Sequence, residues 1–288
     1  MNTFKERSID VIFKMGAATF ENEADTIEIK GLRVIARITT SNLSYNIAQI
    51  MIYGLSQDVM NRLLTLRSMP IANIAEKNTV TLCYPDKTNT TIFSGAIVTA
   101  IADYSSAPNV PFVIEASSTY MAQMKMPQGL PNEGTVKVST IMEKLARLSG
   151  KNLINNGIDN TYTLTDHSLQ GSLQEMMDDV SQAAGIECYT YLNTVVIFPK
   201  GSGRDDLEPI TLSSETGLIG WPTPTDYGCT LRAMYSPDYI AGRKINIVCP
   251  DIPYVNGTMS IIYMVDEIDS QLPGGKWFTH LKLQRFLA

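Results

Sequence analysis

The 288-residue sequence has few of the residues that most often carry catalysis or bind metals. It holds two histidines and four cysteines. The cysteines, at Cys83, Cys188, Cys229 and Cys249, lie 20 or more positions apart, which fits neither a zinc ribbon nor a CxxC redox pair. We therefore expect free, mostly buried thiols and no metal site.

Charge is scarce as well. Charged residues make up 18% of the chain against an average of about 25%, and the net charge is −6. Acidic residues outnumber basic ones in residues 1–115, 116–200 and 201–288 alike, so we expect no specific nucleic-acid binding. No run approaches the ~18 apolar residues of a membrane span, and the first ten residues are charged where a signal peptide is apolar. We expect a soluble protein made in a cytoplasm, with no membrane partner.

The two histidines do not indicate an active site. His167 lies in Thr165-Asp-His-Ser168, but neighbours in sequence do not form a catalytic triad, and no GxSxG elbow supplies a nucleophile. This pattern favours a solvated loop. His280 lies in a strand-like segment and is interpreted as a surface or interface residue.

Other patterns with chemical meaning are equally weak. Glu175, Asp178 and Asp179 share one helical turn, which is typical of a solvated face, with calcium binding as the weaker alternative. The glycines of 201–203 and 274–275 match neither phosphate-binding pattern, so no nucleotide cofactor is expected. A glycosidase needs two facing carboxylates, and nothing singles out a pair.

The first third of the chain reads as strands. Ile9, Val11 and Phe13 alternate with polar residues, and the alternation resumes at 27–29 and, after a bend at Gly31, at 32–38. Further strands are predicted at 45–53, 79–84, 91–102 and 110–116. Ser56 is a candidate N-cap for a short helix that includes Val59, Met60, Leu63, Leu64 and Leu66. About six strands and one helix suffice for a small barrel.

The middle third begins with a proline- and glycine-rich segment, 123–134, that reads as a linker. Two capping boxes follow, Thr140-Ile-Met-Glu143 and Ser172-Leu-Gln-Glu175, each starting an amphipathic helix that stops at Gly150 or Gly185. The segments 186–191 and 194–198 predict a hairpin over Leu192-Asn193.

The last third follows a polar Gly/Ser link at 199–204 and returns to strands, predicted at 229–235, 244–249, 258–269 and 276–286. A chain of this length holds two or three units of ~100–200 residues. We expect a mainly β protein with an α+β insert: a β-barrel domain at 1–116, an α+β domain at 117–203 and a second antiparallel β-barrel at 204–288.

Three passages together resemble the baseplate hub, or tail hub, proteins of contractile-tailed bacteriophages and related contractile injection systems. The first is 31–66, with the corner Ile52-Tyr-Gly-Leu-Ser56, in which Gly54 replaces the usual Asn. The second is Thr216-Gly-Leu-Ile-Gly-Trp-Pro222 followed by Ser236-Pro-Asp-Tyr-Ile-Ala-Gly242. The third is Asn256-Gly257 with 261–269 and Gly275-Lys-Trp-Phe-Thr279.

The resemblance implies a structural protein, not an enzyme, with no catalytic, cofactor-binding or metal-binding residue to carry over. It implies a homotrimer whose two tube-like β-barrels per chain form a pseudo-sixfold ring between the sixfold tail tube and the threefold spike, with a conduit for genome ejection. Tail tube protein, tail spike or tip protein, tape-measure protein and baseplate wedge proteins are the implied partners. The implied location is the virion tail baseplate, assembled in the bacterial host cytoplasm.

Two other functions stay open at this point. One is a tail-associated cell-wall hydrolase, because carboxylate pairing is a property of the fold. The other is a periplasmic or secretin-like scaffold, which would require a signal peptide.

Overall fold

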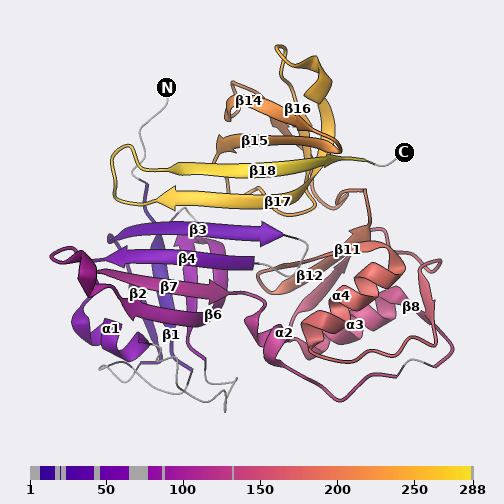
Figure 1. Ribbon diagram of the computed structural model, residues 1–288, viewed down its shortest axis with the longest axis horizontal. Coiled ribbons are helices and arrows are strands. Elements are labelled where there is room, and N and C mark those ends of the chain that lie inside the picture. Colours follow the sequence, from indigo (N-terminus) through magenta and orange to yellow (C-terminus); the bar gives the residue numbers. More distant parts are fainter. Residues whose placement is uncertain are drawn as a thin grey trace. The chain divides into compact units, whose positions relative to one another are not determined.

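The chain forms two compact units (Figure 1). The computed structural model describes residues 7–16, 20, 24–41, 46–64, 77–85, 88–131 and 133–286. Unit 1 comprises Met1–Ile38, Ile47–Tyr120 and Asp266–Trp277; unit 2 comprises Thr39–Asn46, Met121–Val265 and Phe278–Ala288. The fold is mainly antiparallel β with a few helices, as the sequence predicts.

Unit 1 is built from strands in the order β3-β4-β7-β6-β5-β1-β2. The strands are β1 (Asp10–Lys14), β2 (Thr26–Ile29), β3 (Arg33–Ser41), β4 (Asn46–Tyr53), β5 (Thr79–Tyr84), β6 (Thr90–Ala102) and β7 (Pro111–Ser117). Alternation along β3 and β4 buries one face of each strand. Phe13, Ile50 and Phe112 are fully buried. Gly31, at φ 69°, separates β2 from β3, so the predicted bend is a strand break.

The single α-helix among the described residues of the first 116 positions begins where its cap predicts. Helix α1 (Gln57–Leu63) starts after Ser56, whose side chain accepts a hydrogen bond from the Val59 amide. The helix ends at Leu63, with Leu64 as its C-cap. Leu66, predicted to continue the helix, and Tyr45, predicted to start β4, lie outside the described residues.

A turn from the far end of the sequence completes unit 1. The Ser270 hydroxyl accepts from the Val34 amide at 2.9 Å and donates to the Leu32 carbonyl at 3.1 Å. The Ser270 amide donates to the Val34 carbonyl at 2.8 Å. Residues more than 230 positions apart are thereby joined by bonds that satisfy both the hydroxyl and the backbone amide of the buried serine.

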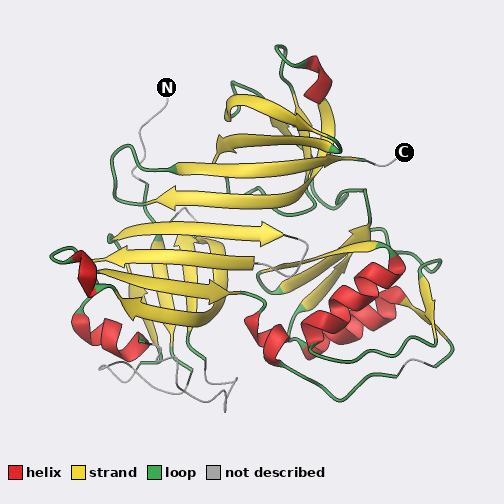
Figure 2. Ribbon diagram, in the orientation of Figure 1, coloured by secondary structure: helices red, strands yellow, loops and turns green. Residues whose placement is uncertain are grey.

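Unit 2 contains an α+β module, residues 135–199, which holds most of the helical residues (Figure 2). Its elements are β8 (Thr135–Lys137), α3 (Val138–Leu148), β9 (Asn152–Asn155), β10 (Thr163–Thr165), α4 (Leu173–Ala184), β11 (Ile186–Tyr191) and β12 (Thr194–Pro199). Strands β11, β12 and β9 form a sheet in that order, and β8 pairs with β10. Helices α3 and α4 pack against each other, on β9 and β11 respectively.

One of the two predicted capping boxes is present. The Ser172 hydroxyl accepts from the Glu175 amide while the Glu175 carboxylate accepts from the Ser172 amide, and Gly185 ends α4 at φ 65°. The predicted hairpin is also confirmed, with Tyr191 opposite Thr194 across the two-residue turn.

The other capping box was predicted wrongly. Helix α3 begins at Val138, two residues before Thr140, and its N-cap, Lys137, makes no side-chain cap. Because β8 runs directly into the helix, the Val138 amide is satisfied by the Tyr162 carbonyl at 3.0 Å. Glu143 pairs instead with Arg147 one turn on, at 3.1 Å.

The last third of the chain is antiparallel β apart from one parallel pair. Its strands are β13 (Ile210–Leu212), β14 (Leu218–Thr225), β15 (Gly228–Met234), β16 (Lys244–Ile247), β17 (Gly257–Asp269) and β18 (Trp277–Arg285). Strand β14 lies at the edge of the order β14-β15-β18-β17 and shifts register between Ile219 and Thr223. Pro222 and Pro224 lie in this edge strand, where a missing backbone amide is tolerated. Because proline in a run argues against a strand, the sequence does not predict β14.

Closure of either set of strands into a barrel stays a prediction, because the described ladders run in open orders. Among the described residues, no helix is long and apolar enough to span a membrane.

Candidate functional site

His167 contacts an acidic residue other than its neighbour in sequence. Its Nε2 is 2.9 Å from the Asp179 carboxylate on α4. Its sequence neighbour Asp166 accepts a hydrogen bond from the Gly134 amide at 2.7 Å, which holds the loop against β8. Asp166 and His167 therefore bond to different partners.

The acidic residues of α4 likewise bond to different partners. Glu175 closes the capping box, and the bonds from Ser172 lower the pKa of its carboxyl. Asp178 accepts from Gln174 at 3.1 Å, and Asp179 pairs with His167. Within the part of the chain that the structure describes, no three metal-ligating side chains gather at one point.

His280 is at the surface and the cysteines are free and mostly buried, as the sequence predicts. His280 is exposed on β18, opposite Arg232, and meets the Phe278 ring edge-on at 5.3 Å. All four cysteines are free, and three are buried. Burial raises the pKa of Cys229 to about 11 and that of Cys188 to about 12, so both stay protonated thiols at neutral pH.

The most connected polar network among these contacts lies in the outgoing segment, residues 200–206, which joins the α+β module to the C-terminal strands. The sequence reads as a polar Gly/Ser link, but Gly201, Gly203 and Arg204 are buried. The Arg204 amide donates to the Gly242 carbonyl at 2.8 Å. A Cβ at Gly203 would lie 3.0 Å from Lys244 and 3.2 Å from the Gly242 carbonyl, so only glycine fits comfortably.

A charged pair anchors this segment. The Arg204 guanidinium holds the Asp206 carboxylate by two parallel bonds, 2.9 and 2.6 Å long. These bonds lower the pKa of Asp206. The arginine side chain is 6% exposed and that of the aspartate 33%, so the pair lies at the margin of the core.

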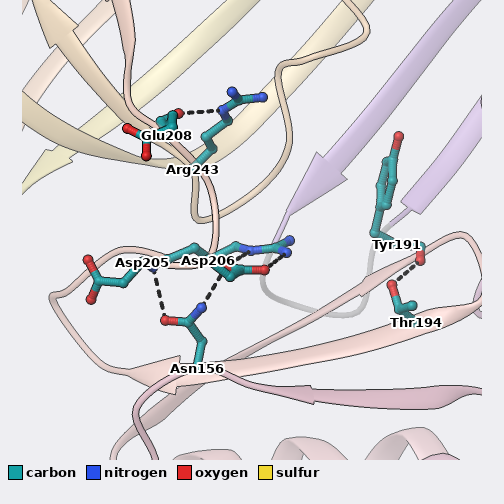
Figure 3. A network of polar contacts seen from close by, with 8 residues as sticks. Asn156, Tyr191, Thr194, Asp205, Asp206, Glu208 and Arg243 are labelled. Atoms are coloured by element: carbon teal, nitrogen blue, oxygen red, sulfur yellow. Dashed lines mark hydrogen bonds and ion pairs between the residues drawn. The ribbon is translucent and has the colours of Figure 1, made fainter.

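Asn156, at the end of β9, ties the same segment to the module. Its side-chain amide donates to Asp206 at 2.6 Å, and its side-chain carbonyl accepts from the Asp205 amide at 3.0 Å (Figure 3). The backbone amide of Asn156 donates to the Ile197 carbonyl at 2.8 Å, which fixes the residue to β12. The Asn156 side chain thus bonds the outgoing segment through both its amide and its carbonyl. The contact between this segment and the residues that hold it is called the joint below.

The beginning of β16 supplies the other side of the joint. Lys244 pairs with the Asp205 carboxylate. The Arg243 guanidinium donates to the Glu208 carbonyl at 3.1 Å (Figure 3) and to the Asp238 carbonyl at 3.0 Å. Two successive basic residues at the beginning of β16 therefore bind both the outgoing segment with its continuation to Glu208 and the chain just before β16.

An apolar contact lies behind the polar one. Strand β12 is buried on both faces: Val195 and Ile197 face the helices, while Val196 and Phe198 pack with Tyr189 and Ala241. The Tyr189 and Phe198 rings stack at 5.6 Å. A Cβ at Gly242, at φ 80°, would meet the Phe198 ring at 2.6 Å. Glycine is therefore required at position 242 both by its backbone and by close approach.

The joint has the character of a structural anchor. Its charged groups pair with one another or donate to backbone carbonyls, as the groups of a structural anchor do. The sequence indicated a polar link at 199–204 and no phosphate loop at Gly201–Gly203, but not the anchoring roles of Arg204, Asp205 and Asp206. The available signal was the run Arg-Asp-Asp directly after two glycines, which places both charge signs beside permissive backbone.

Solved tail proteins share this fold. The tail protein from Neisseria meningitidis MC58 superimposes with a TM-score of 0.63 at 11% identity, covering 96% of both chains. The 43 kDa tail protein of prophage MuSo2 from Shewanella oneidensis gives 0.61 at 9% identity, covering 98% of this chain and 97% of its own. A chain of a PdpA-VgrG complex gives 0.52 at 8% identity, over 98% of this chain and 65% of that one. No curated protein matches the chain in sequence.

These likenesses define the fold as that of tail proteins. The family model described as "Baseplate hub gp41" matches residues 9–272. The chain belongs to this family of structural baseplate hub proteins, as the resemblance in the sequence indicates.

Proposed function

We propose that the protein forms a homotrimeric, pseudo-sixfold ring that adapts the sixfold tail tube to the threefold tail spike. The observation that carries the proposal is the occurrence of two sets of antiparallel strands, one in each unit, in a chain of the baseplate hub family. The α+β module lies between the two sets in sequence.

Symmetry gives the physical reason. Identical copies form closed rings through rotational symmetry, and sixfold and threefold rings do not match directly. If residues 1–116 and 204–288 are two barrels of similar topology, three chains present six similar units to the tube and three module positions to the spike. The low charge content of 18% suits extensive burial between subunits.

The proposed role is structural and non-enzymatic, with the ring as a conduit for the genome. A bore rich in Lys and Arg would retard DNA by counterion release at each phosphate contact. The net charge of −6 per chain, about −18 for three, supports a neutral to acidic bore. The likeness to a chain of a VgrG complex supports a place in contractile injection machinery.

Light scattering of the full chain, with electron microscopy of the particles, tests the ring. We expect a species three times the mass of the monomer and top views with six similar lobes. Stable dimers or tetramers without trimers would contradict the proposal. Tight binding of duplex DNA to the trimer at physiological salt would contradict the conduit.

A further inference from the structure

Three exposed aromatic side chains and one arginine form a surface in unit 2, called here the aromatic patch: Trp221, Tyr227, Tyr254 and Arg285. Trp221, Tyr227 and Tyr254 are 68%, 72% and 66% exposed. Among the described residues, these are three of the four most exposed large hydrophobic side chains. Soluble monomers rarely gather such rings without a partner.

Polar contacts connect the members of the patch and hold them in place. Trp221 Nε1 donates to Asp251 at 3.1 Å, just before the short 3-10 helix η3 (Pro253–Val255) that carries Tyr254. The Arg285 guanidinium lies 5.0 Å from the Tyr254 ring centre and donates to the Tyr254 carbonyl. The Arg285 amide donates to the Tyr227 carbonyl at 2.8 Å. The Trp221 and Tyr254 rings, fixed in this way, lose little conformational entropy on binding.

A second exposed apolar surface, called here the aliphatic row, crosses three neighbouring strands of unit 1. Met51 on β4 lies opposite Val113 on β7, and Val113 lies opposite Ile101 on β6. Directly opposite residues share one face of a sheet. Met51 is 39% and Ile101 52% exposed.

The row lies on the outer face of the sheet, because the alternate residues Ile50, Ile52 and Ile114 are fully buried on the other face. An antiparallel sheet with one solvated face normally carries polar residues there. Here three apolar side chains stand in register at its centre, so this face is suited to a dry contact.

The two surfaces also carry complementary charge. Glu115 is exposed on β7, two residues from Val113 and on the same face, and it forms no ion pair among the described residues. Arg285 in the aromatic patch has no carboxylate partner within the described part of the chain. Each surface thus offers one charge of the sign that the other lacks.

We propose that the aromatic patch of one copy docks on the aliphatic row of the next copy, with Arg285 facing Glu115. The inference rests on the trimer proposed above and names its contact. A closed threefold ring needs a head-to-tail contact between two different surfaces of the same chain. Trp, Tyr and Arg are the residues enriched at interface hot spots, and a flat aliphatic row is a fitting counterpart.

Self-association of full-chain variants tests the contact by sedimentation velocity. Trp221→Ala combined with Tyr254→Ala, and separately Ile101→Asp, should each weaken trimer formation at least tenfold, about the loss expected of hot-spot residues. Met126→Ala is the matched control, because Met126 is 75% exposed and belongs to neither surface. Unchanged circular dichroism and melting temperature show that the variants fold.

Mixing the two defective variants distinguishes a head-to-tail contact from any other. The Trp221→Ala/Tyr254→Ala chain keeps its row and the Ile101→Asp chain keeps its patch. A mixture should therefore form heterodimers, although neither variant associates alone. In a second arm, Glu115→Arg and Arg285→Glu should each weaken the trimer, and the two together in one chain should restore it.

Three outcomes overturn the inference. A wild-type trimer that all these variants leave intact removes the assigned surfaces while the proposed ring stands. Defective variants that do not associate on mixing show that the aromatic patch and the aliphatic row do not contact each other. A wild-type chain that stays monomeric at every concentration overturns the trimer and this contact together.

Discussion

The segments on either side of the α+β module are both rich in proline or glycine, yet they are fixed by different forces. The incoming segment, residues 121–131, is held by backbone bonds: the Leu130 and Leu169 amides and carbonyls exchange bonds of 3.0 and 3.1 Å, and the Leu173 amide donates to the Lys125 carbonyl at 3.0 Å. The outgoing segment is held by side chains, through Arg204 and Asn156. A backbone hydrogen bond can form with almost any side chain at that position, whereas a buried bidentate ion pair requires one particular residue.

The comparison therefore predicts that substitutions in the outgoing joint are costly and specific, while those in the incoming segment are mild. Three changes test this difference, beginning with the largest effect.

Gly242→Ala should lower the free energy of unfolding by about 3–5 kcal/mol. The new methyl group meets the Phe198 ring, and a non-glycine residue at positive φ adds strain. The matched control is Gly220→Ala, because Gly220 has φ 70° with nothing within 4 Å of its Cβ position. Strain alone should cost this control about 1 kcal/mol. Urea unfolding followed by circular dichroism measures both, and equal losses would show that the close approach to Phe198 does not matter.

Arg204→Met should cost about 2 kcal/mol, below the 3–5 kcal/mol of a fully buried pair because Asp206 is one-third exposed. Lys125→Met in the incoming segment is the control, since its exposed ammonium donates only to the Leu148 carbonyl, and should cost less than about 0.5 kcal/mol. Faster hydrogen exchange across residues 200–206 in the Arg204 variant alone locates the effect. Equal losses in the two segments would remove the distinction between them.

The same pair gives a pH dependence with a defined sign. Arg204 lowers the pKa of Asp206 below its ordinary 3.8, so the folded state favours the charged carboxylate. This stabilisation is complete above the unfolded value of 3.8 and is lost as the pH falls through the lower folded value. Between neutral pH and the acid limit, the wild type should lose more stability than Arg204→Met, and parallel curves would contradict the assignment.

The smallest effect separates the two predicted helix caps. Ser172→Ala should cost about 1 kcal/mol, because it removes the cap of α4 next to the bond between Leu173 and the incoming segment. Thr140→Ala should be nearly neutral, because Thr140 is exposed inside α3 and alanine is the better helix former. A comparable loss in Thr140→Ala would show that α3 depends on that hydroxyl after all.

Local pattern was enough where the determinants lie close together in the chain. The capping box at Ser172, the hairpin over Leu192-Asn193 and the alternation in β1 all depend on neighbours within a few residues, and the sequence predicts each of them. The cap at Thr140 failed because β8, held by β10 about 28 positions away, sets where α3 begins. Strand β14 was missed because its prolines are tolerated only at a sheet edge.

The sequence was enough to predict a mainly β fold with two amphipathic helices between its strands, free thiols and membership of the baseplate hub family. The tertiary structure was needed to show that Gly201, Gly203 and Arg204 are buried, that Asn156 meets Asp206, and that Met51, Val113 and Ile101 stand in one row. Periodicity and caps arise from bonds between near neighbours, whose geometry the backbone fixes. Ion pairs and rows across strands depend on register and on residues tens of positions apart, which meet only after the core has closed.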